Sequence, residues 1–335
     1  MHRPPKDPAR RAIAHAALAA LGALAMPSLA LAQGNAGSWP TRPVRVISPY
    51  GAGGSNDISA RIVCEELGRR LGQQFIVENK PGAGTRLGNE MVARATPDGY
   101  TLLFAAAPFA IVESLYGKLS YDPRKDFKPI SLAVVAPIFL VVNAASPFKT
   151  VADLVAHGKA NPQGLTFASP GAGSGPHLAG ELFFREAKVK GLTVHFRGDA
   201  TAYTELLAGR VDATLTAITS ALPHVQSGKL RVLAVASDAR SPVYAEAPTM
   251  AEQGFPGVVG YGWFGMMAPA GTPDAVVGKV NAEMKAILED AGVRQKMLAM
   301  GLQAQGSSPA EFAAFIGKET TKWAAVVKAA DIKGE

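Results

Sequence analysis

A strand pattern, a glycine-rich loop and a helix pattern follow one another three times in this chain. The loops are residues 49–55, 81–84 and 170–175. Each one follows a short run rich in β-branched or aromatic residues and precedes apolar residues at helical spacing. Such repetition with short loops predicts a mostly parallel sheet with helices on both faces. The predicted fold class is therefore α/β.

The length of the chain favours two lobes. About 300 residues follow the N-terminal segment, which is more than one hydrophobic core usually holds. No linker rich in Pro, Gly or Ser separates two domains, so the lobes should be joined by strands that cross between them, at 139–142 and 263–267. We predict a first lobe from 39–141 and 258–335, which includes the C-terminal helices, and a second lobe from 142–257.

The N-terminus has the three parts of a secretory signal peptide. A basic start precedes an apolar run at 12–31, which ends in the small-x-small sequence ALA at 30–32. The basic residues are Arg3, Lys6, Arg10 and Arg11. Pro27 interrupts the run, which argues against a membrane-spanning anchor. We predict cleavage near Ala32 and export to the periplasm, with ordinary secretion favoured over the twin-arginine route.

Charge and cysteine content exclude several classes of protein. Removal of residues 1–32 leaves 30 basic and 26 acidic groups, so the net charge falls to about +4. No run of lysines or arginines indicates a nucleic-acid surface, and the mild positive charge suits a small anion. Cys64 is the only cysteine, so no disulfide can form within the chain.

The glycine-rich loops suggest what the fold binds. A helix N-terminus offers unpaired backbone N–H groups and the positive end of the helix dipole, which attract carboxylate or phosphate. Glycine allows the main chain to approach a ligand closely. Any one of these loops is better explained as a tight turn. Three of them in one exported two-lobed chain favour anion binding.

Enzyme motifs fit the sequence poorly. The spacing of Gly82, Gly84 and Gly88 differs from that of the glycine motif that binds dinucleotides. Ser174 lies one residue too late in its glycine-rich loop for the GxSxG motif of a nucleophile elbow. The histidines lack metal-binding spacing. They include His177, His195 and His224. We predict no enzyme activity, no cofactor and no metal; His177 could contact a ligand, cap a helix or simply pack.

Several segments, in collinear order from residue 39 onward, resemble one family. They are WPTRPVRV at 39–46, GGSND at 53–57, VENKPGAG at 77–84, PDGYTLL at 97–103, YDP at 121–123 with DF at 126–127, PHLAGE at 176–181, LPH at 222–224, WFG at 263–265 and APAGTP at 268–273. The chain resembles the Bug-type receptors, which are the extracytoplasmic solute-binding components of tripartite tricarboxylate transporters.

The resemblance implies a type II periplasmic-binding-protein fold with a ligand cleft between its two lobes. It also implies mono- or dicarboxylate ligands, one carboxylate of which is held by backbone groups and waters at residues 51–57, opposite residues 169–175. The predicted ligand-binding residues are Tyr50, Gly53, Gly54, Ser55, Asp57, Gly84, Thr85, Arg86, Ala106, Ser169, Gly171, Gly173, Ser174, His177, Arg197, Gly198, Asp199 and Thr216.

Two departures from the family pattern bear on the ligand. Thr216 and Ala217 stand where the family commonly has an Asp-Asn pair, and Thr85 and Arg86 stand where it has Gly-Asn. Loss of a cleft acid and gain of an arginine would favour a ligand without an amino group. Arg86 either binds a second carboxylate or turns outward to solvent, and the sequence leaves both possibilities open.

These observations predict a monomeric receptor that captures a small organic carboxylate outside the cytoplasmic membrane. Its partners would be the two membrane subunits of a tripartite tricarboxylate transporter. The alternative is an orphan receptor that feeds a sensor kinase. A secreted hydrolase would need a nucleophile–base pair, which we cannot assemble. The effector lobe of a transcription factor would carry a helix-turn-helix and no signal peptide.

Overall fold

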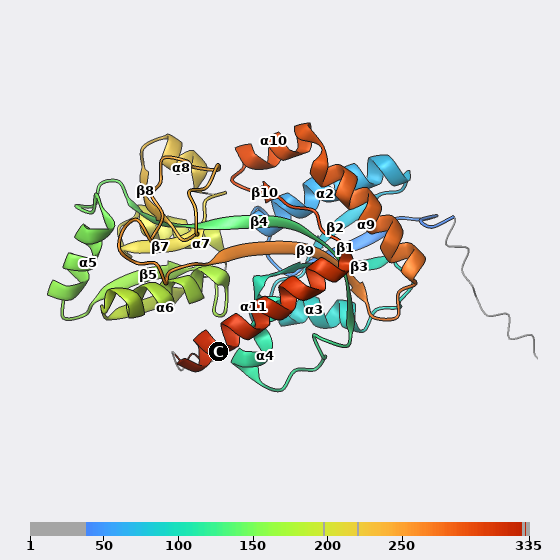
Figure 1. Ribbon diagram of the computed structural model, residues 1–335, viewed down its shortest axis with the longest axis horizontal. Coiled ribbons are helices and arrows are strands. Elements are labelled where there is room, and N and C mark those ends of the chain that lie inside the picture. Colours follow the sequence, from blue (N-terminus) through green and yellow to red (C-terminus); the bar gives the residue numbers. More distant parts are fainter. Residues whose placement is uncertain (1–37, 197, 220, 330–331, 333–335) are drawn as a thin grey trace, which may run out of the picture. The chain divides into compact units, whose positions relative to one another are not determined.

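A computed structural model describes residues 38–196, 198–219, 221–329 and 332 (Figure 1). The predicted signal peptide at 1–32 lies outside the described residues. Residues from Trp39 onward form one compact unit. None of the helices in the described part of the chain is long and apolar enough to cross a membrane.

Three parallel strands form the edge of the first lobe. Their order in the sheet is β2 (Phe75–Asn79), β1 (Val44–Ser48) and β3 (Thr101–Ala106). Val46 and Ile47, whose side chains point to opposite faces of the sheet, are both fully buried, as expected for a strand covered by helices on both faces. The helical segments that follow β1, β2 and β3 are α2 (Ser55–Leu71), η1 (Ala83–Thr85), α3 (Arg86–Ala93), η2 (Ala107–Ala110) and α4 (Val112–Tyr116).

One long strand belongs to both lobes. Strand β4 (Phe127–Asn143) has 17 residues and passes from one lobe into the other in Figure 1. Up to Pro137 it pairs antiparallel with β9 (Tyr261–Pro269) of the first lobe, and from Ile138 it pairs with strands of the second. The partner therefore changes between Pro137 and Ile138, one residue before the crossing that the sequence indicates at 139–142.

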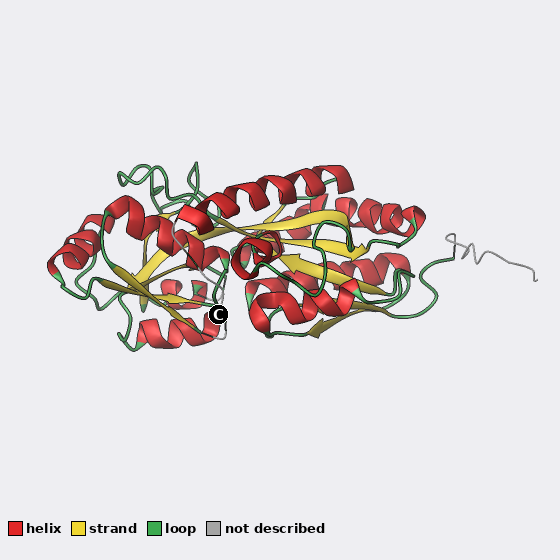
Figure 2. Ribbon diagram, turned by 90° about the horizontal axis from the view of Figure 1, so that it is seen from below, coloured by secondary structure: helices red, strands yellow, loops and turns green. Residues whose placement is uncertain are grey.

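The second lobe repeats the βα pattern. Its sheet follows the order β4, β7, β5, β6, with β8 also pairing with β4. The elements are α5 (Val151–Ala160), β5 (Leu165–Ser169), α6 (Gly175–Ala187), β6 (Gly191–His195), α7 (Asp199–Leu207), β7 (Ala213–Ala217), α8 (Leu222–Gln226) and β8 (Leu230–Val235). Helices cover both faces of the strands in Figure 2, so the α/β prediction is confirmed.

The C-terminal elements close the first lobe. They are α9 (Asp274–Glu289), α10 (Ala291–Ala299), β10 (Gln303–Ala304) and α11 (Pro309–Ala329). Trp323 of α11 is fully buried in a cluster with Ile111, which follows β3, and Leu178 of α6. The last helix thus packs against both lobes on one side of the crossing strands.

Candidate functional site

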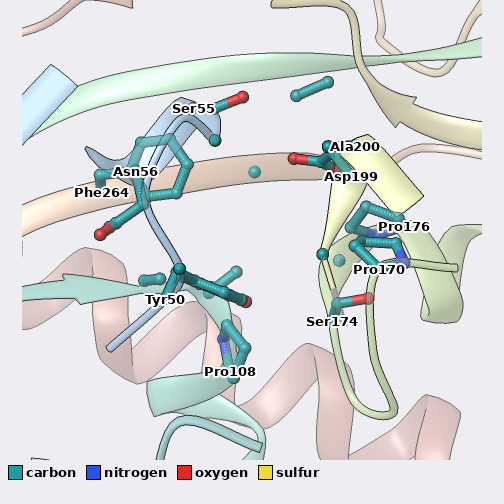
Figure 3. Close-up of a pocket in the computed structure, with 18 of the residues that line it drawn as sticks. Tyr50, Ser55, Asn56, Pro108, Pro170, Ser174, Pro176, Asp199, Ala200 and Phe264 are labelled. Atoms are coloured by element: carbon teal, nitrogen blue, oxygen red, sulfur yellow. The ribbon is translucent and has the colours of Figure 1, made fainter. Parts of the chain in front are cut away.

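A cavity of about 110 Å³ lies where the two lobes meet. This is roughly ten times the space that a single buried water needs. The lining residues are Tyr50, Gly51, Ala52, Gly54, Ser55, Asn56, Ala106, Ala107, Pro108, Ile138, Pro170, Ser174, Gly175, Pro176, Gly198, Asp199, Ala200, Ala217, Gly262 and Phe264. Figure 3 shows Tyr50 and Ser55 on one wall, with Ser174 and Asp199 on the facing wall. We call this space the inner chamber.

Three helices begin at the inner chamber. For each of α2, α6 and α7, both the N-cap residue and the first helical residue line the wall; these pairs are Gly54 and Ser55, Ser174 and Gly175, and Gly198 and Asp199. The first-turn N–H groups of a helix have no partner within the helix, and they carry the positive end of its dipole. No side chain of the described residues caps α2 or α7, which leaves their first-turn N–H groups available to an anion.

A buried network holds the first loop in place. Asp57 accepts hydrogen bonds from the Gly53 amide at 3.0 Å, from Asn79 Nδ2 at 2.9 Å and from Arg61 Nε at 3.1 Å. Burial alone would raise the pKa of Asp57, but these hydrogen bonds together hold it below its ordinary value. Asp57 therefore lies beneath the loop as its anchor, outside the lining of the inner chamber.

The hydroxyl of Ser55 is a candidate ligand donor. It is buried, and no described residue hydrogen-bonds its Oγ. An unsatisfied buried hydroxyl costs free energy, and nearly all such groups in native proteins find a partner. Because Ser55 lines the chamber, a ligand oxygen placed there would satisfy it.

Asp199 is the one acidic residue among the described lining residues, none of which is Lys or Arg. Thr216 Oγ1 donates to Asp199 Oδ1 at 3.3 Å. Burial raises the pKa of Asp199 to about 6, and the bond from Thr216 opposes the rise. The pKa of Tyr50 is raised by burial and by the charge of Asp199. A carboxyl group is thus present in the cleft, next to Thr216, the position at which the sequence led us to expect the loss of a cleft acid.

The third glycine loop is held by His177. Its Nδ1 accepts a hydrogen bond from the Gly173 amide at 3.0 Å, while Ser174 Oγ accepts from the His177 amide at 3.3 Å. Burial, with a smaller contribution from the charge of His195, lowers the pKa of His177 to about 4. His177 is therefore neutral near pH 7, as an acceptor nitrogen requires.

A second space, the outer chamber, adjoins the first and shares Tyr50 and Ser174 with it. The second glycine loop, Tyr116 and His195 also line it. Arg86 lines neither chamber. Its guanidinium lies 3.7 Å from the centroid of the Tyr116 ring, and its Nε donates to the Ala83 carbonyl at 2.8 Å.

The predicted ligand-binding residues fall into separate groups. Those in the inner chamber are Tyr50, Gly54, Ser55, Ala106, Ser174, Gly198 and Asp199. Those in the outer chamber alone are Gly84, Thr85 and Gly171. Those that line neither chamber are Gly53, Asp57, Arg86, Ser169, Gly173, His177 and Thr216. Arg197 lies outside the described residues.

Sequence reasoning did not select the chamber residues that come from the crossing strands. Ile138 of β4 and Gly262 and Phe264 of β9 line the inner chamber. The sequence marked these strands as crossings between lobes. A strand that passes between two lobes also passes the cleft, and this was the signal that could have found them.

A family model described as "Tripartite tricarboxylate transporter family receptor" matches residues 59–332. The chain belongs to this family. The predicted Bug-type resemblance is confirmed, and the family consists of solute-binding receptors, so this chain is a receptor and not an enzyme.

Solved structures extend this likeness. A Rhodopseudomonas palustris protein with adipate is 32% identical, with a TM-score of 0.85, over 88% of this chain and 99% of that one. The periplasmic binding protein BugD is 34% identical, with a TM-score of 0.83, over 89% and 100%. MatC from Rhodopseudomonas palustris with bound malate is 33% identical, with a TM-score of 0.80, over 86% and 100%. The predicted two-lobed periplasmic-binding-protein fold is thereby confirmed.

Proposed function

We propose that this receptor binds a small dicarboxylate in the inner chamber. The observation that carries the proposal is the convergence of the N-termini of α2, α6 and α7 on a wall whose described residues include no Lys or Arg. Such a site attracts a carboxylate through backbone N–H groups and helix dipoles. The relatives with adipate and with malate hold ligands of this class.

The rest of the wall suits the carbon chain of such a ligand. Ala106, Ile138, Pro176 and Phe264 are apolar and come from both lobes. Small-molecule sites commonly combine an apolar lining with a few polar groups that fix orientation. The outer chamber provides room for the second end of a longer ligand, next to the second glycine loop.

We further propose that the receptor acts in the periplasm, as a monomer, after removal of residues 1–32. The family to which the chain belongs and its likeness to BugD, a periplasmic binding protein, support this location. In this proposal the loaded receptor delivers its ligand to the two membrane subunits of a tripartite tricarboxylate transporter. An orphan receptor that feeds a sensor kinase is the alternative.

Ligand-dependent stabilisation tests the binding proposal. We expect C4 to C8 dicarboxylates, malate and adipate among them, to raise the Tm of the purified protein while the matched neutral diamides do not. A ligand at a hundred times its Kd adds about 2.7 kcal/mol to the free energy of unfolding. The ligand should be recovered unchanged by mass spectrometry. Absence of stabilisation by any carboxylate, or chemical conversion of the ligand, would contradict the proposal.

Ser55→Ala provides a matched variant for this experiment. Since no described residue bonds the Ser55 hydroxyl, which is costly to bury unpaired, its removal should maintain or slightly raise the stability of the unliganded protein. Loss of one hydrogen bond to an ionised ligand carboxylate, worth about 1.5–3 kcal/mol, should weaken binding by roughly ten- to a hundredfold.

Uptake measurements separate the two partners. A strain without the gene should lose uptake of the radiolabelled dicarboxylate if the receptor feeds a transporter. Normal uptake, together with loss of a transcriptional response to the same compound, would support the sensor alternative.

A further inference from the structure

Asp199 presents a problem for a site that binds anions. It is the first residue of α7, and its side chain lies in the wall of the inner chamber (Figure 3). The positive ends of three helices favour one negative charge, and the ligand carboxylate would bring it. An ionised Asp199 would place a second negative charge in the same small space. Any role of Asp199 toward such a ligand rests on the proposed function.

The two oxygens of Asp199 have different surroundings. Oδ1 accepts from Thr216 Oγ1 at 3.3 Å, and that hydroxyl lies 2.9 Å from the hydroxyl of Tyr203. Oδ2 faces the first glycine loop of the other lobe, since a Cβ atom on Gly54 would lie 3.7 Å from it. Oδ2 is therefore directed at the N-terminus of α2, where the ligand carboxylate is expected.

No cation of the described lining residues balances Asp199. Tyr50 of the first glycine loop lies close enough for the charge of Asp199 to raise its pKa. In the second lobe, the hydroxyl of Tyr203 contacts that of Thr216, which in turn hydrogen-bonds Asp199. His195 lines the outer chamber, and Arg197, two residues before Asp199, lies outside the described residues. Two carboxylates that share a site whose described lining residues include no cation do not both ionise readily, so we expect one of them to hold a proton.

We propose that Asp199 contacts the ligand as a neutral carboxylic acid, whose Oδ2–H donates a hydrogen bond to a ligand carboxylate. The proton comes from solvent and stays on Asp199, and no bond of the ligand is broken. Binding thus takes up about one proton. The arrangement also selects for carboxylates without an ammonium group, because an ammonium would face the positive ends of three helices and a neutral acid.

The pH dependence has a definite sign. Burial places the pKa of Asp199 at about 6, so the neutral form dominates below that pH and is a minor form at pH 7. Above about pH 6 the affinity should fall roughly tenfold for each further pH unit. Below about pH 4 to 5 it should fall again, because the carboxylates of the ligand themselves take up protons.

Calorimetry with a dicarboxylate that binds the wild type, between pH 5.5 and 8.5, tests the proposal. We expect a loss of affinity on the order of a hundredfold from pH 6.5 to 8.5. Repeating the titration in phosphate and in Tris, whose ionisation enthalpies differ, should show uptake of about one proton per ligand at pH 7.5 and above.

Asp199→Asn is the decisive variant. Its amide N–H replaces the acid O–H at every pH, while its oxygen still accepts from Thr216. We expect it to bind with an affinity that no longer depends on pH between 6 and 8.5, and without proton uptake. Thr216→Val removes the bond that lowers the pKa of Asp199, so its pH profile should move to higher pH.

The outcomes separate this inference from the proposed function. A wild type that binds dicarboxylates equally well at every pH, or an Asp199→Asn variant that loses binding more than tenfold at every pH, would overturn the role of Asp199. Preference for an amino dicarboxylate over its deaminated analogue would also overturn it. Failure of the wild type to bind any carboxylate at any pH would instead overturn the proposed function.

Discussion

The first and second glycine loops of the first lobe look alike in sequence and differ in structure. In the first loop only Gly53 has a positive φ, of 83°, and the loop lines the inner chamber. In the second loop four consecutive residues have positive φ; these are Gly82 at 140°, Ala83 at 49°, Gly84 at 59° and Thr85 at 76°. The second loop lines the outer chamber alone.

The difference shows that glycine content does not determine what a loop does. The first loop presents an unstrained N-cap, Gly54 at φ −85°, and an uncapped helix beside the inner chamber. The second loop forces Ala83 and the β-branched Thr85 into the left-handed region, at about 1–3 kcal/mol for each residue. The guanidinium of Arg86 packs on the ring of Tyr116, which lies next to this loop. We therefore expect the first loop to control affinity and the second to control mainly stability.

The largest expected effect is that of Gly54→Val on binding. A charge-assisted hydrogen bond contributes about 1.5–3 kcal/mol, so loss of close approach to the ligand should weaken binding by roughly ten- to a hundredfold. The fold should be unaffected, because φ of −85° suits any residue. Gly54→Ala is the control, since its Cβ would make an ordinary 3.7 Å contact with Asp199. Unchanged affinity of the valine variant in calorimetry would show that the first loop serves only as a turn and does not bind the ligand.

A pair of alanine variants compares the two loops at positive φ. In Gly53→Ala the new Cβ meets nothing within 4 Å, so backbone strain alone should lower the free energy of unfolding by about 1 kcal/mol. In Gly84→Ala the Cβ would lie 2.6 Å from Tyr116 Oη, which must move, so we expect a loss of about 2 kcal/mol. Urea unfolding measures both. Equal losses of stability in the two variants would show that Tyr116 moves aside at no cost in free energy.

The smallest expected effect is that of Arg86→Gln. Removal of a cation–π contact at a partly exposed site should lower stability by about 0.5–1 kcal/mol. Affinities for a dicarboxylate and for a matched monocarboxylate should both change by less than roughly twofold, since Arg86 lines neither chamber. Arg42→Gln is the matched control, because Arg42 lies 3.9 Å from the centroid of the Tyr100 ring. A loss confined to the dicarboxylate would place Arg86 in the site.

Much of the fold could be predicted because local patterns of apolar residues and glycines determine where its strands and helices begin. The strand pattern of Val44, Val46 and Ile47 becomes β1, and the apolar run at 75–77 begins β2. The helix starts at the cavity could also be predicted, because carboxyl ends of parallel strands meet at one edge of a sheet. Gly54 and Ser174 lie in two of the glycine-rich loops for which the strand–loop–helix pattern predicts this position, and the structure places both in the wall of the inner chamber.

The remaining site residues depend on tertiary structure. Nothing local shows that Asp57 anchors the first loop while Asp199 lines the chamber, since both are acids near the start of a helix. The side chain of Arg86 packs on Tyr116, which lies on a different helix, so the local sequence does not determine where it points. Phe264 lines the chamber only because β9 returns past the cleft.

The shared strand β4 and the return of the chain through β9 have a consequence for the order of folding. Every strand of the second lobe other than β4 lies between β4 and β9 in the chain, so its pairings involve a contiguous segment. The first lobe, in contrast, must join Leu103 to Met267 before its sheet is complete. Long-range pairing of this kind is slow, because the loop entropy is lost before the contacts form. We therefore expect the second lobe, which comes from one contiguous segment, to fold first, and the sheet of the first lobe to wait for the arrival of β9.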